Sequence, residues 1–330
     1  MGLRAYLAKR ILYSIALVFL VITLNFVLFM SMPGGPMAGL ANPSRLREQA
    51  AIEEQMRRFG LLDPPHIRYL KYVQSMLTFQ FGYSYHTNKL IYTEIGMRLT
   101  NTFAMVIPAE IIAIVIGLLF GVFAAYKRGR TLDLSTSMAS IVTNSLPVFW
   151  VGGVLLLIFS FTLGLFPSNH AYPSEWMLTG RWPTNIWVEL SVRLQHLFLP
   201  ILTLVIILTG SYFLLTRASM MEILSEDYLV TAKAKGLSNR KVLFKHAFKN
   251  ASLPVITNIA IAFGFMLSGA TVTETVFAYQ GLGLWIWESL DYADFPALQA
   301  IFFLIALCVI IANLAADLAY GIIDPRIKYE

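Results

Sequence analysis

Charged side chains are scarce in this sequence. Lys, Arg, Asp and Glu make up only 13% of its 330 residues, whereas 57% are hydrophobic. A soluble domain of this length needs a more charged surface to stay dispersed in water, and an integral membrane protein does not. The composition therefore predicts a membrane protein.

Patterns for catalysis, metal binding and nucleotide binding are also missing. The single cysteine, Cys308, can form neither a disulfide within the chain nor a zinc site, so we interpret it as a packed hydrophobic residue. The five histidines show no ligand spacing such as H-E-x-x-H. The dipeptide Gly-Lys is absent, which excludes a Walker A phosphate loop. We therefore predict no catalytic residue, no metal site and no cofactor bound by this chain.

Six apolar runs are long enough to cross a bilayer, which takes about 20 residues. They cover residues 11–30, 103–126, 137–163, 197–216, 255–278 and 297–321. Basic residues precede the first run, as in a secretory signal, but the run is longer than the apolar part of such a signal. We predict a retained signal anchor, followed by five further membrane helices.

The orientation follows from the basic residues of the short loops. They lie after the second, fourth and sixth runs, whereas the loop after the fifth run carries acidic residues and no Lys or Arg. The positive-inside rule then places both termini in the cytoplasm. The net charge of +6 is a signal of topology, so we predict a lipid membrane and no nucleic acid around this chain.

The long loop between the first two runs falls outside the cell, because long loops cross largely regardless of their charge. Ser44 and Gly60 mark the ends of a predicted helix in this loop. Pro64-Pro65 predicts an extended link, and residues 69–77 form a second amphipathic stretch. We therefore divide the chain into a signal anchor with an extracytoplasmic insertion, residues 1–100, and a five-helix core, residues 101–330.

The loop of residues 226–254, between the fourth and fifth runs, has more pattern than a connector needs. Tyr228, Leu229, Ala232 and Leu237 recur at helical spacing, and Gly236 interrupts them as a helix C-cap would. A proline then closes the loop just before the next run. A short amphipathic helix on the basic, cytoplasmic side indicates a docking site for a soluble partner. The alternative is a solvated basic loop that serves topology alone.

These residues resemble the cytoplasmic loop of ATP-binding-cassette importer permeases, specifically the dipeptide/oligopeptide branch. The matching residues are Glu226-Asp227-Tyr228, Thr231-Ala232-Lys233-Ala234-Lys235-Gly236-Leu237, His246-Ala247, Asn250-Ala251 and Leu253-Pro254. The general motif of these importers begins Glu-Ala-Ala six residues before the glycine, where this chain has Val230-Thr231-Ala232. The peptide branch commonly lacks that glutamate. Further matching segments run nearly end to end: Met32-Pro33-Gly34-Gly35-Pro36, Gly60-Leu61-Leu62-Asp63-Pro64, Phe81-Gly82 with Ser84, Glu274-Thr275-Val276-Phe277, Gly281-Leu282-Gly283 and Asp324-Pro325-Arg326.

The resemblance implies an all-α permease subunit of the type I importer fold with six membrane helices. It also implies a second, related permease, two ATPase subunits that use ATP and magnesium, and an extracytoplasmic substrate-binding protein. The implied substrates are di- or oligopeptides, and an oligosaccharide is the alternative. Within a cytoplasmic coupling segment, residues 218–254, it implies these ATPase-coupling residues: Glu226, Asp227, Tyr228, Ala232, Ala234, Gly236, Leu237, Leu253 and Pro254. In this interpretation Gly236 allows a sharp turn and Ala232 a close approach.

Several polar residues lie inside the apolar runs, where they must face protein or water. The candidates for a translocation path are Glu110, Asn144, Ser145, Asn258, Ser268 and Thr271. Hydrogen bonding between helices is the alternative, and for Glu110 both interpretations stay open. For Asp317 we favour hydrogen bonding. A relay through Glu110 and Asp317 would instead make the chain an ion-coupled carrier. We interpret Gly117-x3-Gly121 and Gly152-Gly153 as packing sites. Trp176, Trp182 and Trp187 are interpreted as residues of the membrane interface, and a surface that receives a binding protein is the alternative.

Overall fold

The computed structural model describes residues 3–32 and 62–323, and their regular elements are all helical. The predicted helix between Ser44 and Gly60 and the segment Asp324-Pro325-Arg326 lie outside these residues. The α-helices are α1 Leu3–Met30, α3 Pro65–Leu77, α4 Ile91–Tyr126, α5 Thr131–Ser145, α6 Val148–Leu155, α7 Ser174–Thr179, α8 Ile186–Leu224, α9 Asp227–Ala234, α10 Asn239–Lys241, α11 Phe248–Gly269, α12 Thr271–Val276, α13 Leu282–Asp291 and α14 Phe295–Ile323. Two π-helical stretches, η2 Leu156–Thr162 and η3 Val242–Ala247, continue α6 and α10.

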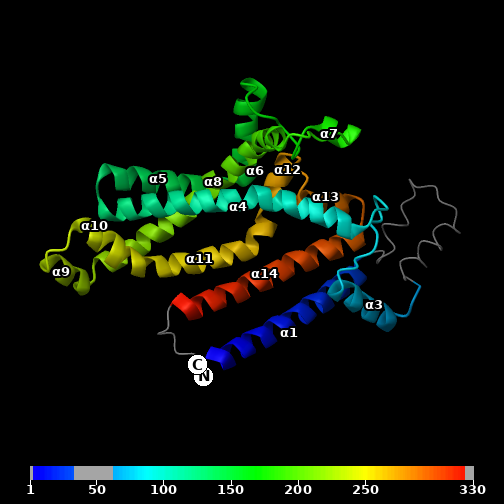
Figure 1. Cartoon of the computed structure of the whole chain (residues 1–330), viewed down its shortest axis with the longest axis horizontal. Helices are drawn as coiled ribbons and strands as arrows, with labels where there is room; N and C mark the ends of the chain where they lie inside the picture. Colours follow the sequence, from blue (N-terminus) through cyan, green and yellow to red (C-terminus); the bar gives the residue numbers. More distant parts are fainter. Residues whose placement is uncertain (1–2, 33–61, 324–330) are drawn as a thin grey trace. The chain divides into compact units, whose positions relative to one another are not determined.

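The chain forms two compact units, whose elements can be followed in Figure 1. The first unit combines Met1–Thr102 with Gln280–Glu330, and the second is Phe103–Tyr279. Helix α4 passes from the first unit into the second. The boundary predicted at residue 100, between the signal anchor with its insertion and the five-helix core, was drawn by function and stays a prediction.

In the first unit, α1 and α14 lie side by side and run in opposite directions (Figure 1). The buried residues of α1 include Ile22, Asn25 and Phe29, which are three and four positions apart and therefore share one face. Asn25 Nδ2 donates a hydrogen bond to the backbone oxygen of Gln299 at 2.9 Å. Most other apolar residues of α1 are exposed, as expected of a helix with lipid around it.

The proline pair of the insertion is a helix start. Pro64 has extended angles, φ −56° and ψ 148°, and α3 begins at Pro65. The expected extended link is therefore wrong for Pro65, because the first helical position tolerates proline, whose missing N–H would be unpaired there anyway. The helix expected at residues 69–77 starts four residues earlier than predicted.

A buried carboxylate joins two segments of the first unit that are far apart in sequence. Asp294 is 1% exposed and directly precedes α14. Its side chain accepts hydrogen bonds from the Ser84 hydroxyl, from the Tyr85 backbone N–H at 2.9 Å and from the His86 N–H at 3.3 Å. It also accepts the Ala297 N–H at 3.4 Å and so caps α14.

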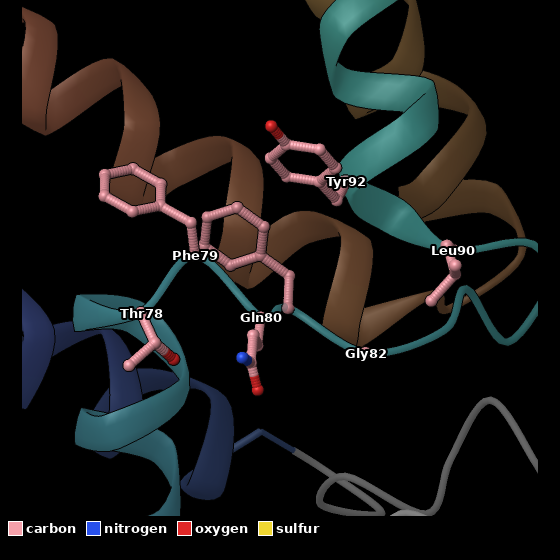
Figure 2. Close-up of a pocket in the computed structure, with 7 residues that line it drawn as sticks. Thr78, Phe79, Gln80, Gly82, Leu90 and Tyr92 are labelled. Carbon is pink, nitrogen blue, oxygen red and sulfur yellow. The ribbon is translucent and has the colours of Figure 1, made fainter.

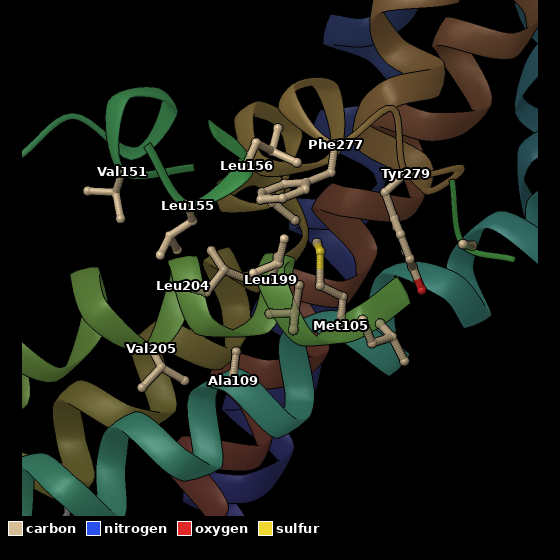
Figure 3. Packing of buried hydrophobic residues seen from close by; sticks show 14 of the residues in the cluster. Met105, Ala109, Val151, Leu155, Leu156, Leu199, Leu204, Val205, Phe277 and Tyr279 are labelled. Atoms are coloured by element: carbon tan, nitrogen blue, oxygen red, sulfur yellow. The ribbon is translucent and has the colours of Figure 1, made fainter. Parts of the chain in front are cut away.

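In the second unit, an apolar core fills the space between α4, α6, α8 and the segment after α12 (Figure 3). The residues labelled in Figure 3 that form it include Met105 and Ala109 of α4, and Leu199 and Leu204 of α8. Phe277 closes the core from the other side. This core holds together the helices that carry the candidate site residues of this unit.

Glycines allow α4 and α8 to approach closely. A Cβ atom at Gly117 would lie 2.5 Å from the Cβ of Tyr212, and one at Gly121 would lie 2.7 Å from the Cβ of Thr216. The predicted packing role is therefore confirmed for this pair. It is wrong for Gly153, where a Cβ atom would meet nothing within 4 Å.

In the described part of the chain, four helices are long and apolar enough to cross a membrane: α1, α4, α8 and α14. Helices α5 and α6–η2 make a fifth candidate if they count as one span. The run of residues 137–163, predicted as one span, is broken: α5 and α6–η2 are bent by 101°. Pro147 explains the bend, because it forces Leu146 before it into extended angles, φ −76° and ψ 137°.

The run of residues 255–278 is divided as well. Helix α11 begins at Phe248, seven residues earlier, and ends at Gly269, and α12 follows as a separate element. Pro254 lies inside α11, so the expectation that it closes the loop is wrong. Membrane helices tolerate such prolines because neighbouring groups satisfy the freed backbone. The count of six spans and the cytoplasmic position of both termini stay predictions.

Candidate functional site

The coupling segment is a helix, a sharp turn and a returning helix. Residues 218–224 still belong to α8, and only two residues separate α8 from α9. Gly236 follows α9 with φ +76°, a left-handed conformation that side chains with a Cβ rarely adopt. A Cβ atom there would meet nothing within 4 Å, so the backbone conformation, not the space, requires glycine. This confirms the predicted helix end. The chain then returns through α10 and η3 into α11.

The inner face of α9 packs on this chain's own helices. Leu229 is 2% exposed, and Ala232 is buried beside it. Both belong to one apolar cluster with Val122 and Ala125 of α4 and with Met220 of α8. Ala232 is thus buried within this chain, and its predicted role in close approach at the coupling site stays a prediction. The returning arm completes the cluster with Val242, Leu243, Ala247 and Ala251.

The outer face of α9 is exposed. Val230, which stands where the general importer motif has glutamate, is 65% exposed, so an apolar side chain is presented at that position. Tyr228 is also exposed, and its hydroxyl accepts a hydrogen bond from Asn250 Nδ2 at 2.8 Å and donates to the His246 backbone oxygen at 3.3 Å. Tyr228 thus fastens α9 to the returning arm. The other predicted coupling residues are exposed at Glu226, Asp227, Ala234 and Pro254 and half-buried at Leu237 and Leu253.

A partly buried ion pair lies just before the start of this segment. Arg217 of α8 places Nε 2.5 Å and Nη2 3.1 Å from the two carboxylate oxygens of Asp133 in α5. The Gly129 N–H donates to the same carboxylate at 2.9 Å. Sequence reasoning missed this pair. The only signal was an acidic residue directly after a basic turn, together with an arginine near the end of a span.

Glu110 lies between helices. It is 3% exposed and accepts a hydrogen bond from the Tyr212 hydroxyl of α8. This is the interhelical arrangement that was one of its two interpretations. The side chains of two other predicted residues, Ser268 and Asp317, lie outside the described part of the chain.

Two polar side chains meet on an exposed face close to the bend at Pro147. Asn144 Oδ1 accepts a hydrogen bond from Ser211 Oγ of α8 at 2.6 Å, and both residues are exposed. Ser145, also exposed, donates to a backbone oxygen of its own helix. Ser211 was not among the predicted path residues. Of the other candidates, Asn258 is exposed and Thr271 is half-buried.

The three tryptophans differ in their surroundings. The Arg193 guanidinium lies 5.6 Å from the Trp182 ring centre and 5.5 Å from that of Tyr172. Trp176 is half-buried and packs against the apolar core, whereas Trp187 is largely exposed. Trp187 alone is thus placed with its ring mostly free of protein contacts.

The first unit contains a cavity of about 840 Å³ (Figure 2). Its lining residues are Thr78, Phe79, Gln80, Phe81, Gly82, Leu90 and Tyr92. None of the predicted coupling or path residues lines it. Across residues 3–32 and 62–323, no three His, Cys, Asp or Glu side chains are grouped closely enough to hold a metal ion.

Comparison with known proteins agrees with this arrangement. The family described as "binding-protein-dependent transport system inner membrane component" matches residues 117–329, which include the coupling segment. The chain belongs to this family. It is a membrane protein and a transport permease subunit.

Characterised relatives are similar over nearly their full length. The oligopeptide transport system permease protein AppB of Bacillus subtilis is 33% identical over 98% of this chain and 99% of its own. The di/tripeptide transport system permease protein DppB of Pseudomonas aeruginosa is 33% identical over 99% of each. The glutathione transport system permease protein GsiC of Salmonella typhimurium is 34% identical over 98% of this chain and 99% of its own.

Proposed function

We propose that this chain is one permease subunit of an ATP-driven importer of di- or oligopeptides. Membership of the binding-protein-dependent family and the names of relatives that transport peptides support the proposal. The chain has no phosphate loop of its own, so partner subunits bind and hydrolyse the ATP. A second, related permease shares the path, and a substrate-binding protein delivers the substrate from outside.

The single observation that carries the proposal is the two-sided form of α9. One side is buried through Leu229 and Ala232 in a cluster with residues of α4, α8 and the returning arm, and the other presents Tyr228 and Val230 to the surroundings. Helices bind grooves of partner proteins through such exposed apolar residues with charged neighbours. We therefore place the ATPase subunit on the outer face of α9 and the turn at Gly236.

This docking allows ATP binding and hydrolysis by the partner subunits to move the membrane helices of the permease. Closure of two ATPase subunits brings the coupling segments of two permeases together, and each segment moves the spans to which it is attached. The path then opens outward by rigid-body movement, which is alternating access. The exposed pair Asn144 and Ser211 is a candidate for the wall of that path, whereas the buried Glu110 serves as a bond between helices.

Substitutions at Gly236 test the docking. Gly236→Val forces a β-branched residue into a left-handed conformation, so we expect the turn to change and uptake to separate from ATP hydrolysis, while the protein still inserts into the membrane. Gly236→Asn is the matched control, because asparagine tolerates this conformation. The measurement is peptide uptake and ATP hydrolysis by the whole importer in liposomes. Normal coupled transport by the valine variant would contradict the docking.

The ligand of the binding protein distinguishes a peptide importer from an oligosaccharide importer. Affinity of a co-purifying binding protein for glycans instead of peptides would favour an oligosaccharide. Uptake that an ionophore abolishes and ATP depletion does not would favour the ion-coupled carrier. Membership of a binding-protein-dependent family and the burial of Glu110 against Tyr212 speak against that carrier.

A further inference from the structure

We propose that Asp133 and Arg217 are positioning residues for energy coupling. In this proposal, their ion pair makes the cytoplasmic ends of α4, α5 and α8 move as one body with α9. The movement of the coupling segment then reaches the spans by two routes, through α11 and through this three-helix body. The proposal rests on the docking of the ATPase at α9 described above.

The geometry of the pair fixes direction as well as distance. Two nitrogens of Arg217 face the two carboxylate oxygens of Asp133, at 2.5 and 3.1 Å. Such a paired contact constrains rotation of the partners, which a single contact does not. Asp133 is only 4% exposed, whereas the Arg217 side chain is 25% exposed, so water and salt reach the pair from the arginine side and screen it in part. The Gly129 N–H adds the turn between α4 and α5 to the same carboxylate.

Only a short stretch of chain separates the ion pair from α9. Arg217 is seven residues, about two helical turns, before the end of α8 at Leu224. The two linking residues are themselves tied, since the Glu226 N–H donates to the Ile223 oxygen at 3.0 Å. A displacement of α9 therefore acts directly on the part of α8 that holds Arg217.

Contacts to α4 complete the body. Leu229 of α9 packs in one cluster with Val122 and Ala125 of α4. Gly121 brings α4 so close to α8 that a Cβ atom would lie 2.7 Å from the Thr216 Cβ. Helices α4 and α8 are thus coupled by close packing. Helix α5 also packs on α8, where a Cβ atom at Gly210 would lie 2.7 Å from the Ser140 oxygen, and the ion pair adds a directional link near their ends.

The test uses the whole importer reconstituted in liposomes with its own binding protein. The variants are Asp133→Asn, Arg217→Gln, Arg217→Lys and the double variant D133N/R217Q. The readout is the ratio of ATP hydrolysis with and without the binding protein carrying its bound ligand, normalised to the ATPase subunits retained. Asp63→Asn is the matched control, because Asp63 pairs with the exposed Lys71 at 2.6 Å in the other unit.

We expect each single variant to retain the ATPase subunits and to lose about tenfold of the stimulation, within the range of measured couplings between sites. Arg217→Lys keeps the charge but not the paired geometry, so it should also lose stimulation. The double variant should lose much less than the product of the two single losses, because both substitutions remove one shared interaction. Asp63→Asn should behave as the wild type.

Three results would distinguish the possibilities. Wild-type stimulation in all Asp133 and Arg217 variants that retain the ATPase would overturn the positioning role. A second combination of results would also overturn it: the single variants fail to assemble, whereas the double variant assembles and is stimulated normally. The pair would then serve folding alone. A wild-type importer without stimulation by the binding protein would instead refute the proposed function.

Discussion

At the scale of single residues, buried carboxylates connect segments of the chain whose proximity the sequence does not reveal. Asp294 and Asp133 are both almost fully buried, and each accepts hydrogen bonds from a segment far away in the chain. Such groups are expensive to leave without partners, so their donors hold these segments together. The sequence shows only an aspartate near a predicted loop in each case, and the partners, Ser84 and Arg217, lie 210 and 84 positions away.

Replacement of Asp294 should loosen the first unit. In Asp294→Asn an amide group replaces one carboxylate oxygen and meets N–H donors in place of an acceptor. Hydrogen bonds to charged groups contribute about 1.5–3 kcal/mol each, so we expect a loss of roughly 3 kcal/mol of stability. The measurement is thermal unfolding of the purified protein in detergent. Asp291→Asn, at an exposed position three residues earlier, should leave the midpoint unchanged, and an equal effect of both variants would contradict this role.

Gly236 shows what sequence reasoning at single positions can achieve. A glycine after a helical pattern indicates a left-handed residue, and that depends only on local conformation. The same reasoning did not show that Ala232 faces inward while Val230 faces outward, because the short helix places apolar residues on both faces. The face of α9 that becomes buried depends on where the neighbouring helices lie. The local sequence pattern of α9 does not specify their position.

At the scale of elements, the apolar runs predicted where long helices lie but not how they bend. The prediction located α1, α4, α8 and α14, since about 20 apolar residues have few other stable forms in a membrane. Proline was ambiguous. Pro147 divides a run, whereas Pro254 lies inside a continuous helix. The sequence pattern around the two prolines is similar, and tertiary packing decides between the outcomes.

The contact between α4 and α8 predicts opposite effects for two alanine substitutions in one helix. Gly117→Ala places a methyl group 2.5 Å from the Tyr212 Cβ, so one helix must shift, at a cost of about 1–3 kcal/mol. At Gly96 the methyl group meets nothing within 4 Å, so Gly96→Ala should stabilise α4 by roughly 0.5–1 kcal/mol. Thermal unfolding of both variants in detergent checks the signs. A stabilising effect at Gly117 would show that the two helices are not in close contact.

At the scale of the whole molecule, the chain is a transport permease subunit of the binding-protein-dependent family, and the elements of its described part are helical. The all-helical architecture followed from composition, because the bilayer leaves helices as the main solution for long apolar runs. The division into two units did not follow, since it depends on α13 and α14 packing with the N-terminal part of the chain. Contacts between segments some 200 residues apart leave no local pattern.

The predicted orientation can be tested because the chain has a single cysteine. In a Cys308→Ala background, one new cysteine is placed at exposed Lys235 of the coupling segment and another at exposed Lys89 of the insertion. An impermeant maleimide applied to sealed right-side-out vesicles should label Lys89→Cys at once. Lys235→Cys should react only after detergent opens the vesicles. Arg130→Cys, in the basic turn after α4, should behave like Lys235→Cys. Labelling of Lys235→Cys in sealed vesicles would place the coupling segment outside the cell, out of reach of any ATPase, and would contradict both the orientation and the docking.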